Sequence, residues 1–359
     1  MVILTFLIGV ATTFFTIFAV HILCYRRHRT RFQTVVGIIM AMWAVWFAKD
    51  LVTCWLGMYR DDVLTRIYFI DGWTALAYTS FIFEVVLPGW TTWRRMLLLA
   101  IPFALFTLGY ALWPCRQMVW GYTTFLWCYG WTIVIIGWFK MKRYLCYIRS
   151  EYSTIEKIDV SWLRPVFLFA IIGQLLWLFI SFYANAVADS VYCASSIALW
   201  LMVLHYSWNF EPIVVEKEQA ITPKQSNTLV MEDVAEHQEN VRYQLPDGKL
   251  EQVMEEKKLY LEPNLTLKAL AQELNTNRTY ISTYLSRKVG MTFYDYINQL
   301  RIVRAALPLM NEHPEFKFEV IAKESGFASM STFRRAFAKV TGKTPSQYED
   351  SMSDQQQIS

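Results

Sequence analysis

The chain of 359 residues is 55% hydrophobic, with a mean hydropathy of +0.25, so it is too apolar for a wholly soluble protein of this size. The net charge of +4 is unevenly distributed. Residues 211–262 hold six Lys and Arg against twelve Asp and Glu, whereas residues 263–348 hold twelve against six. Much of the chain must therefore lie in lipid, and an acidic linker precedes a basic module whose charge suits a polyanion.

The first 210 residues contain seven apolar runs, each long enough to cross a bilayer as a helix of about 20 residues. We place these runs at Val2–Leu23, Thr34–Gly57, Ile67–Gly89, Met96–Trp113, Met118–Phe139, Pro165–Ala184 and Tyr192–Trp208. No basic residue precedes the first run and no small-x-small site follows it, so it is predicted to be a retained helix and not a cleaved signal peptide. The pattern predicts a seven-helix transmembrane domain over residues 1–210.

Basic residues in the loops between these runs predict the orientation of the bundle. The first, third and fifth loops hold twelve Lys and Arg, whereas the second, fourth and sixth hold three. Since basic loops remain in the cytoplasm, the N-terminus is expected outside and the C-terminus inside a bacterial cytoplasmic membrane.

Charged side chains inside apolar runs are costly in lipid and are therefore candidate functional residues. The candidates for binding a signal ligand are Lys49, Asp50, Asp71 and Glu84. The second and third runs are antiparallel neighbours, so Lys49 or Asp50 is expected to approach Asp71. Two interpretations stay open: an ion pair that only fixes the helices together, or the polar floor of an outward-facing pocket. The aromatic residues expected around such a pocket are Trp43, Trp46, Trp55, Tyr68, Trp73 and Tyr78.

The polar, acidic segment 211–248 is predicted to be a flexible linker. A helical pattern from Lys249 to Leu261 opens a second domain that we place at residues 249–350, followed by a disordered tail at 351–359.

Two segments of this second domain have the pattern of a helix-turn-helix unit, in which a supporting helix and a tight turn precede a helix that reads the major groove. In the first unit, Asn275 to Asn277 form the turn, and Ile281 and Leu285 are predicted to be buried. In the second unit, Gly326 supplies a turn residue for which positive φ is inexpensive, and Phe327, Phe333 and Phe337 point inward. The exposed faces then carry the candidate DNA-binding residues Arg278, Thr279, Ser282, Thr283, Ser331, Arg334 and Arg335. Arg, Ser and Thr side chains suit contacts to base edges and phosphates.

The stretch LTLKALAQELNTNRTYISTYLSRKVGMTFYDYINQLRIVRA, followed by IAKESGFASMSTFRRAFAKVTGKTPSQY, resembles the DNA-binding domain of AraC/XylS-type transcription regulators. The resemblance implies two helix-turn-helix units, joined by a long helix near Tyr294–Leu307, that enter successive major-groove segments. Carried onto matching positions, Arg278, Thr279 and Ser282 serve one segment, and Ser331, Arg334 and Arg335 the other. Pro308 departs from the family pattern, because it removes an amide donor and can kink or end that helix.

The fold class expected from these observations is all-α, a polytopic seven-helix bundle followed by a tandem helix-turn-helix domain. The predicted function is a membrane-embedded one-component transcription regulator that binds promoter DNA and responds to an envelope or membrane signal. The alternative is a small membrane transporter or membrane enzyme with an autoregulatory DNA-binding tail. The chain has no HExxH, GxSxG or GxxxxGK[ST] motif, so we predict no enzyme activity, cofactor or metal site. The expected partners are double-stranded DNA, the lipid bilayer, RNA polymerase, a second copy of the chain and a signal ligand.

Overall fold

The computed structural model describes residues 2–26, 30–57, 61–182, 186–208, 210 and 248–358. Within these ranges the chain is helical, and its only β-type pairing is an isolated bridge between Tyr152 and Thr266, which confirms the all-α fold class. The linker predicted at residues 211–248 lies outside the described ranges except for Gly248.

The chain divides into two compact units. The first consists of Met1–Tyr144 and Val160–Gln219, and the second consists of Leu145–Asp159 and Ala220–Ser359. Residues 145–159, which sequence analysis counted with the membrane domain, are thus part of the same compact unit as the C-terminal domain.

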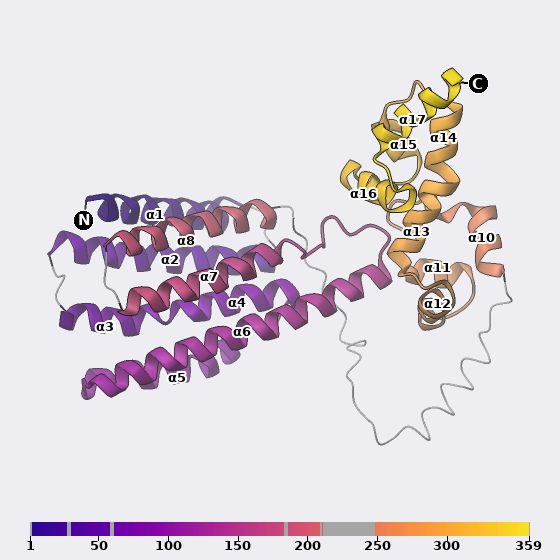
Figure 1. Cartoon of the computed structure of the whole chain (residues 1–359). Coiled ribbons are helices and arrows are strands. Elements are labelled where there is room, and N and C mark those ends of the chain that lie inside the picture. The colour runs from indigo at the N-terminus through magenta and orange to yellow at the C-terminus, as the bar shows by residue number, and fades with distance from the viewer. Residues whose placement is uncertain are drawn as a thin grey trace, which may run out of the picture. The chain divides into compact units, whose positions relative to one another are not determined.

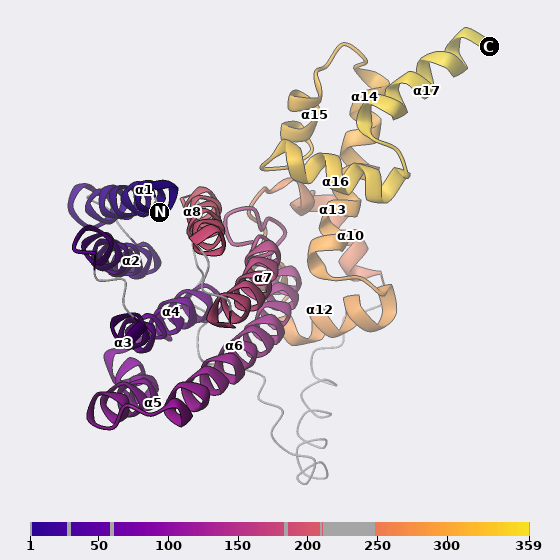
Figure 2. The same ribbon diagram turned by 60° about the vertical axis from the view of Figure 1, so that its left-hand side comes forward.

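The long helices of the first unit run alongside one another, and α3 and α4 follow each other end to end (Figures 1 and 2). They are α1 (Val2–Val20, continued by a π-helical turn at His21–Tyr25), α2 (Arg31–Trp55), α3 (Asp61–Asp71), α4 (Thr74–Val86), α5 (Trp93–Leu112), α6 (Arg116–Glu151), α7 (Leu163–Phe182) and α8 (Ala186–Ser207). Helix α1 packs against α2 and α8, and α4 packs against α2 and α5. Helix α6 begins in this unit and ends in the second.

Five helices in the described residues are long and apolar enough to cross a membrane. They are Ile3–Tyr25, Arg31–Trp55, Trp93–Leu112, Arg116–Glu151 and Ser190–Ser207, and Leu163–Leu176 is a shorter apolar helix. These six correspond to six of the seven predicted runs.

For the remaining run, Ile67–Gly89, the prediction of one continuous helix is wrong. The chain forms two helices there, α3 and α4, with an interruption between them. Tyr122 of α6 donates its hydroxyl to the carbonyl of Phe69 at 3.0 Å, and the amide of Trp73 bonds instead to Ile70 at 3.1 Å. A Cβ on Gly72 would lie 2.1 Å from the Tyr122 hydroxyl oxygen. A hydrogen bond from a distant helix therefore replaces the local helical bond, which the hydropathy pattern cannot indicate.

The second unit contains two small helical cores joined by one long helix. Its elements are α10 (Lys249–Lys257), the 3₁₀ turn η3 (Leu259–Leu261), α11 (Leu267–Glu273), α12 (Arg278–Tyr284, continued by the π turn η4, Leu285–Val289), α13 (Phe293–Arg301), η5 (Ile302–Ala306), α14 (Leu307–Glu312), α15 (Phe318–Glu324), α16 (Met330–Thr341) and α17 (Pro345–Ile358). The first core gathers residues from Leu250 to Ala305 and the second from Ile302 to Phe337. Helix α17 continues to Ile358, in contrast to the disordered tail expected from Ser351. Ser, Asp and Gln carry only small helix penalties, so this polar segment can extend a helix that is already formed.

The long connecting helix runs from Phe293 to Glu312 and includes Pro308. The five residues before Leu307 form a π-helical turn, η5. A proline removes one amide donor and its ring crowds the carbonyl four residues earlier, which here is Arg304 in η5. The wider π turn removes that conflict, so the helix continues past Pro308.

Candidate nucleic-acid interface

The first helix-turn-helix unit has the turn that its sequence predicts. Asn275 adopts φ of 51°, a left-handed conformation that Asn tolerates better than most residues. Asn277 caps α12, since its side chain accepts the amide of Tyr280 at 2.7 Å. Ile281 and Leu285 are each 1% exposed, which fixes the inner face of the reading helix against the core.

The outer face of α12 is polar. Thr279 and Thr283 are exposed and Ser282 is half-buried. Arg278, the first residue of the helix, is half-buried because it lies beside Glu151, with 3.8 Å between Nη1 and Oε2. The structure thus brings these four predicted residues onto the free face of one helix.

The second unit depends on a close backbone approach at Gly326. Its φ is +82°, and a Cβ at this position would lie 2.6 Å from the carbonyl oxygen of Leu261. Glycine is therefore required both by conformation and by space. This contact positions the turn between α15 and α16 against η3.

Helix α16 presents a polar and basic outer face. Ser329 caps the helix by accepting the amide of Thr332 at 3.3 Å, and Phe333 and Phe337 are fully buried. Ser331, Arg334 and Arg335 are exposed on the opposite face. Serine and arginine on the free face of such a helix can donate to base edges and phosphates.

A buried arginine that sequence analysis missed joins the parts of this domain. Arg301 is fully buried, and its guanidinium donates to the carbonyl oxygens of Tyr260 and Glu262, each at 2.7 Å. It also donates to Asn298 Oδ1 at 3.2 Å and to Ser153 Oγ at 3.3 Å. Burial lowers the pKa of Arg301 to about 10, against partial opposition from Glu156. In the sequence, Arg301 is one of twelve Lys and Arg residues of the basic module, and nothing in its neighbours marks it as buried.

Tyr294, near the start of α13 in the connecting helix, lies beside the second reading helix and bonds to Thr332 of α16. Burial raises the pKa of its phenol, while Arg335 lowers it. The residues that act on Tyr294 include Arg335 on α16 and Glu156 from the 145–159 segment. A negative charge from outside the helix-turn-helix sequence therefore lies in the environment of the second reading helix.

In the first unit, the ion pair predicted between the second and third apolar runs is present. Lys49 Nζ lies 2.6 Å from Asp50 Oδ1 and 2.7 Å from Asp71 Oδ1. The three side chains remain 24%, 33% and 36% exposed. The geometry is compatible with both interpretations, a fixed ion pair and a polar binding surface.

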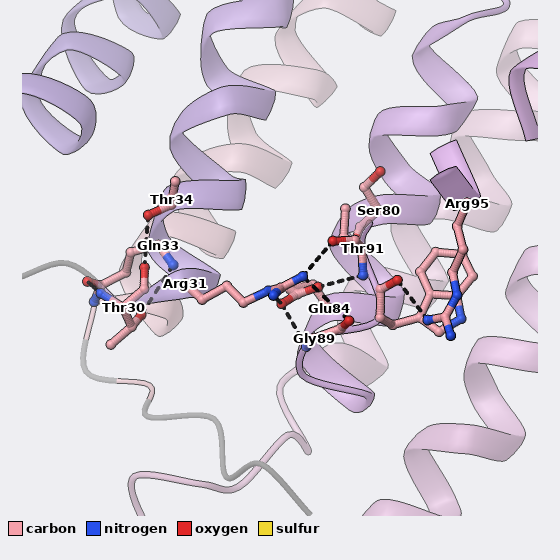
Figure 3. Close-up of polar contacts among 10 residues, drawn as sticks. Thr30, Arg31, Gln33, Thr34, Ser80, Glu84, Gly89, Thr91 and Arg95 are labelled. Carbon is pink, nitrogen blue, oxygen red and sulfur yellow. Dashed lines mark hydrogen bonds and ion pairs between the residues drawn. The ribbon is translucent and has the colours of Figure 1, made fainter. Parts of the chain in front are cut away.

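Glu84, the fourth candidate in the apolar runs, is buried, and both of its carboxylate oxygens bond to other residues of the chain (Figure 3). It is 1% exposed, and its two carboxylate oxygens accept the amides of Gly89 and Thr91, each at 2.9 Å. Arg31 Nε lies 3.1 Å from Oε1, and Arg31 also donates to the Thr91 carbonyl at 2.6 Å. These bonds favour a structural role, in which Glu84 holds the loop after α4 against the start of α2.

The six aromatic residues predicted around a pocket do not share one environment. Trp43 is 4% exposed and stacks on Phe15, whereas Trp55 is 83% exposed. Tyr68 bonds to Thr123 at 2.7 Å and Trp73 to Thr107 at 3.1 Å. The structure therefore separates these side chains among buried, interhelical and exposed positions.

The C-terminal fold defines a class: two helix-turn-helix units, each with an apolar inner face and a polar reading face, joined by one helix. Residues 270–351 match a family model described as a helix-turn-helix domain. The C-terminal part of the chain is thus a helix-turn-helix domain of the AraC type.

Two similar proteins have names that include the term HTH-type transcriptional regulator. A protein of Staphylococcus aureus called an uncharacterized HTH-type transcriptional regulator is 30% identical over 104 residues, which is 29% of this chain and 14% of that protein. The uncharacterized HTH-type transcriptional regulator YobQ of Bacillus subtilis (strain 168) is 30% identical over 93 residues, or 26% of this chain and 38% of YobQ. The chain thus spans well under half the length of these relatives. No solved structure matches it.

Proposed function

We propose that this protein is a membrane-embedded, one-component transcription regulator that binds specific promoter DNA through α12 and α16. The observation that carries the proposal is the joining of the two parts in one chain. Five helices suited to a bilayer precede a domain whose second reading helix exposes Ser331, Arg334 and Arg335. The basic bias of the odd-numbered loops would place that domain in the cytoplasm, where the chromosome lies.

Within this proposal, the two reading helices have different chemistry. The outer face of α12 offers Arg278, Thr279, Ser282 and Thr283, whereas α16 offers two adjacent arginines. Arginine can donate two parallel hydrogen bonds to the O6 and N7 atoms of guanine. We therefore assign base discrimination chiefly to α16, with the hydroxyls of α12 contacting bases or phosphates of a neighbouring groove segment.

We also propose that the Lys49–Asp50–Asp71 cluster is the polar element that a signal acts on. The three groups lie close together and are not fully enclosed by protein, and we assign to them the binding of an ion or polar ligand. A charged cluster within apolar helices is costly and needs a reason. RNA polymerase and a second copy of the chain are the expected partners on the DNA.

The DNA-binding assignment is tested with the full chain in lipid nanodiscs. Genomic fragments retained by the protein are sequenced, and the most enriched duplex is then used in binding measurements. Arg334→Ala should weaken binding to this duplex by about 1 to 3 kcal/mol, roughly 5- to 150-fold, if Arg334 contacts a base edge. Arg304→Ala is the matched control, because Arg304 is an exposed arginine on the connecting helix, paired with Glu255 at 2.5 Å. Equal effects of the two substitutions, or none, would reject the assignment of Arg334.

A further inference from the structure

The segment 145–159 belongs by sequence to the loop between two apolar helices and by structure to the DNA-binding unit. It comprises the end of α6, from Leu145 to Glu151, and the following residues to Asp159. Ile148 is fully buried, and Ile155 is 5% exposed. The segment is therefore packed as part of this unit.

Its attachment is centred on Ser153, which is fully buried. The Ser153 amide donates to the carbonyl of Leu265 at 3.1 Å, and its hydroxyl donates to the same carbonyl at 2.7 Å. Arg301 donates to the Ser153 hydroxyl, and Thr154 donates to the carbonyl of Pro263. The segment is thus bonded to the residues that lead into the first helix-turn-helix unit.

Two carboxylates of the segment contact the reading helices, one at the start of α12 and the other at the start of α16. Glu151 pairs with Arg278, the first residue of α12, at 3.8 Å. Glu156 accepts the hydroxyls of Ser329 at 3.0 Å and Thr332 at 2.5 Å, at the start of α16. In a helix-turn-helix complex, the N-terminal residues of the reading helix contact base edges in the major groove.

Bound DNA and these contacts conflict electrostatically. Duplex DNA carries one negative charge per about 1.7 Å of its axis. Glu151 pairs with the guanidinium of Arg278 and so competes with a DNA phosphate for it. Glu156 adds a second negative charge at the start of α16, where the duplex would bind. Like charges facing each other in an interface oppose association.

We propose that residues 145–159 form an autoinhibitory segment that occupies the starts of α12 and α16 and competes with promoter DNA. The proposal rests on the proposed function, since it names how DNA binding by these helices is regulated. Both chain neighbours of the segment, α6 up to Tyr144 and the residues from Val160, belong to the apolar unit. A signal that favours a state of that unit in which the segment is withdrawn would raise the affinity for DNA.

The test compares DNA binding by the full chain in nanodiscs with and without the two carboxylates. The double variant Glu151→Gln with Glu156→Gln should bind the enriched duplex at least 10-fold more tightly than the unsubstituted protein. The matched control is Glu255→Gln with Glu273→Gln, which removes two negative charges from pairs elsewhere on the same unit. The control should change affinity by less than 3-fold. Fragment selection is carried out with both the unsubstituted protein and the double variant, so that a strongly inhibited protein still gives a duplex.

Hydrogen exchange is the second measurement, because DNA would leave the exchange rates of residues 145–159 unchanged if the segment had only a permanent structural role. Amides of residues 145–159, including that of Ser153, should exchange faster when saturating duplex is added. A double variant that binds no more tightly than the control variant, with a segment that stays protected on DNA, would overturn autoinhibition and leave the DNA-binding function intact. Failure of every form, the double variant included, to prefer any genomic fragment over a mixed-sequence duplex would overturn both proposals.

Discussion

Replacing Arg301 by methionine tests whether this buried arginine holds the DNA-binding unit together. The substitution keeps a long side chain but removes the donors to Tyr260, Glu262, Asn298 and Ser153. The two bonds at 2.7 Å are hydrogen bonds from a charged donor, each stabilising the fold by about 1.5 to 3 kcal/mol. Because burial lowers the pKa of Arg301 to about 10, removing the charge also relieves a desolvation cost. We expect a net loss of about 2 to 4 kcal/mol.

For a domain of this size, such a loss lowers the melting temperature by roughly 10 to 20 °C. The assay is protease cleavage of the full chain in detergent over a temperature series, with a C-terminal tag reporting the intact domain. Arg304→Met is the control, because Arg304 is 53% exposed and its pair with Glu255 is a surface salt bridge of about 0 to 1 kcal/mol. If Arg301→Met melted within about 3 °C of Arg304→Met, the central role assigned to Arg301 would be refuted.

Two further predictions concern a glycine and the charged cluster. Gly326→Ala should destabilise the second unit by about 3 kcal/mol or more, because a Cβ would lie 2.6 Å from the Leu261 carbonyl oxygen at a φ of +82°. Gly342→Ala, at φ +75° with nothing within 4 Å, should cost only about 1 kcal/mol in the same melting assay; equal losses would disprove the steric argument. Lys49→Met should reduce the amount of membrane-inserted protein, since it leaves the carboxylates of Asp50 and Asp71 without their cation at an insertion cost of about 2.5 to 3.5 kcal/mol per charge. Lys49→Met with Asp50→Asn and Asp71→Asn removes all three charges, so it should restore insertion yet abolish any response of a promoter reporter to growth conditions; a retained response would remove the cluster from signal detection.

The parts of the DNA-binding domain that could be predicted from sequence depend on local chemistry. Asn275 and Gly326 have the left-handed conformations that their turns require. Phe333 and Phe337 are buried on one face of α16, and Arg334 and Arg335 are exposed on the other. Helical periodicity over a few neighbouring residues predicts which side chains are buried and which are exposed, so the prediction needs no knowledge of distant partners.

The parts that could not be predicted depend on partners far along the chain. Arg301 bonds to Ser153, and Glu156 bonds to Ser329 and Thr332, across more than a hundred residues of sequence. These contacts leave no periodic signal, so the sequence places the 145–159 segment with its flanking helices. The interruption of the helix near Gly72 also depends on a distant residue, because the hydroxyl of Tyr122 on α6 bonds to the carbonyl of Phe69.

The antiparallel arrangement of neighbouring apolar runs predicts that Lys49 or Asp50 approaches Asp71, and in the structure Lys49 makes this long-range contact. A short loop limits where two such helices can place their side chains, so a non-local contact becomes predictable when the connection is short. Glu84 shows the limit of the same reasoning. Its charge identified it as a candidate, but its partners Gly89 and Thr91 are loop amides that hydropathy does not reveal.

We propose above that the chain binds promoter DNA through its C-terminal domain while its first unit is embedded in the bilayer. The most direct measurement is to cross-link living cells, isolate the membrane fraction, purify the tagged full-length chain from it and sequence the attached DNA. We predict that discrete promoter fragments accompany the intact chain and are lost with Arg334→Ala and Arg335→Ala together. Recovery of such fragments only with a shorter, soluble product, or an outward location of a tag placed after Ser359, would contradict the account.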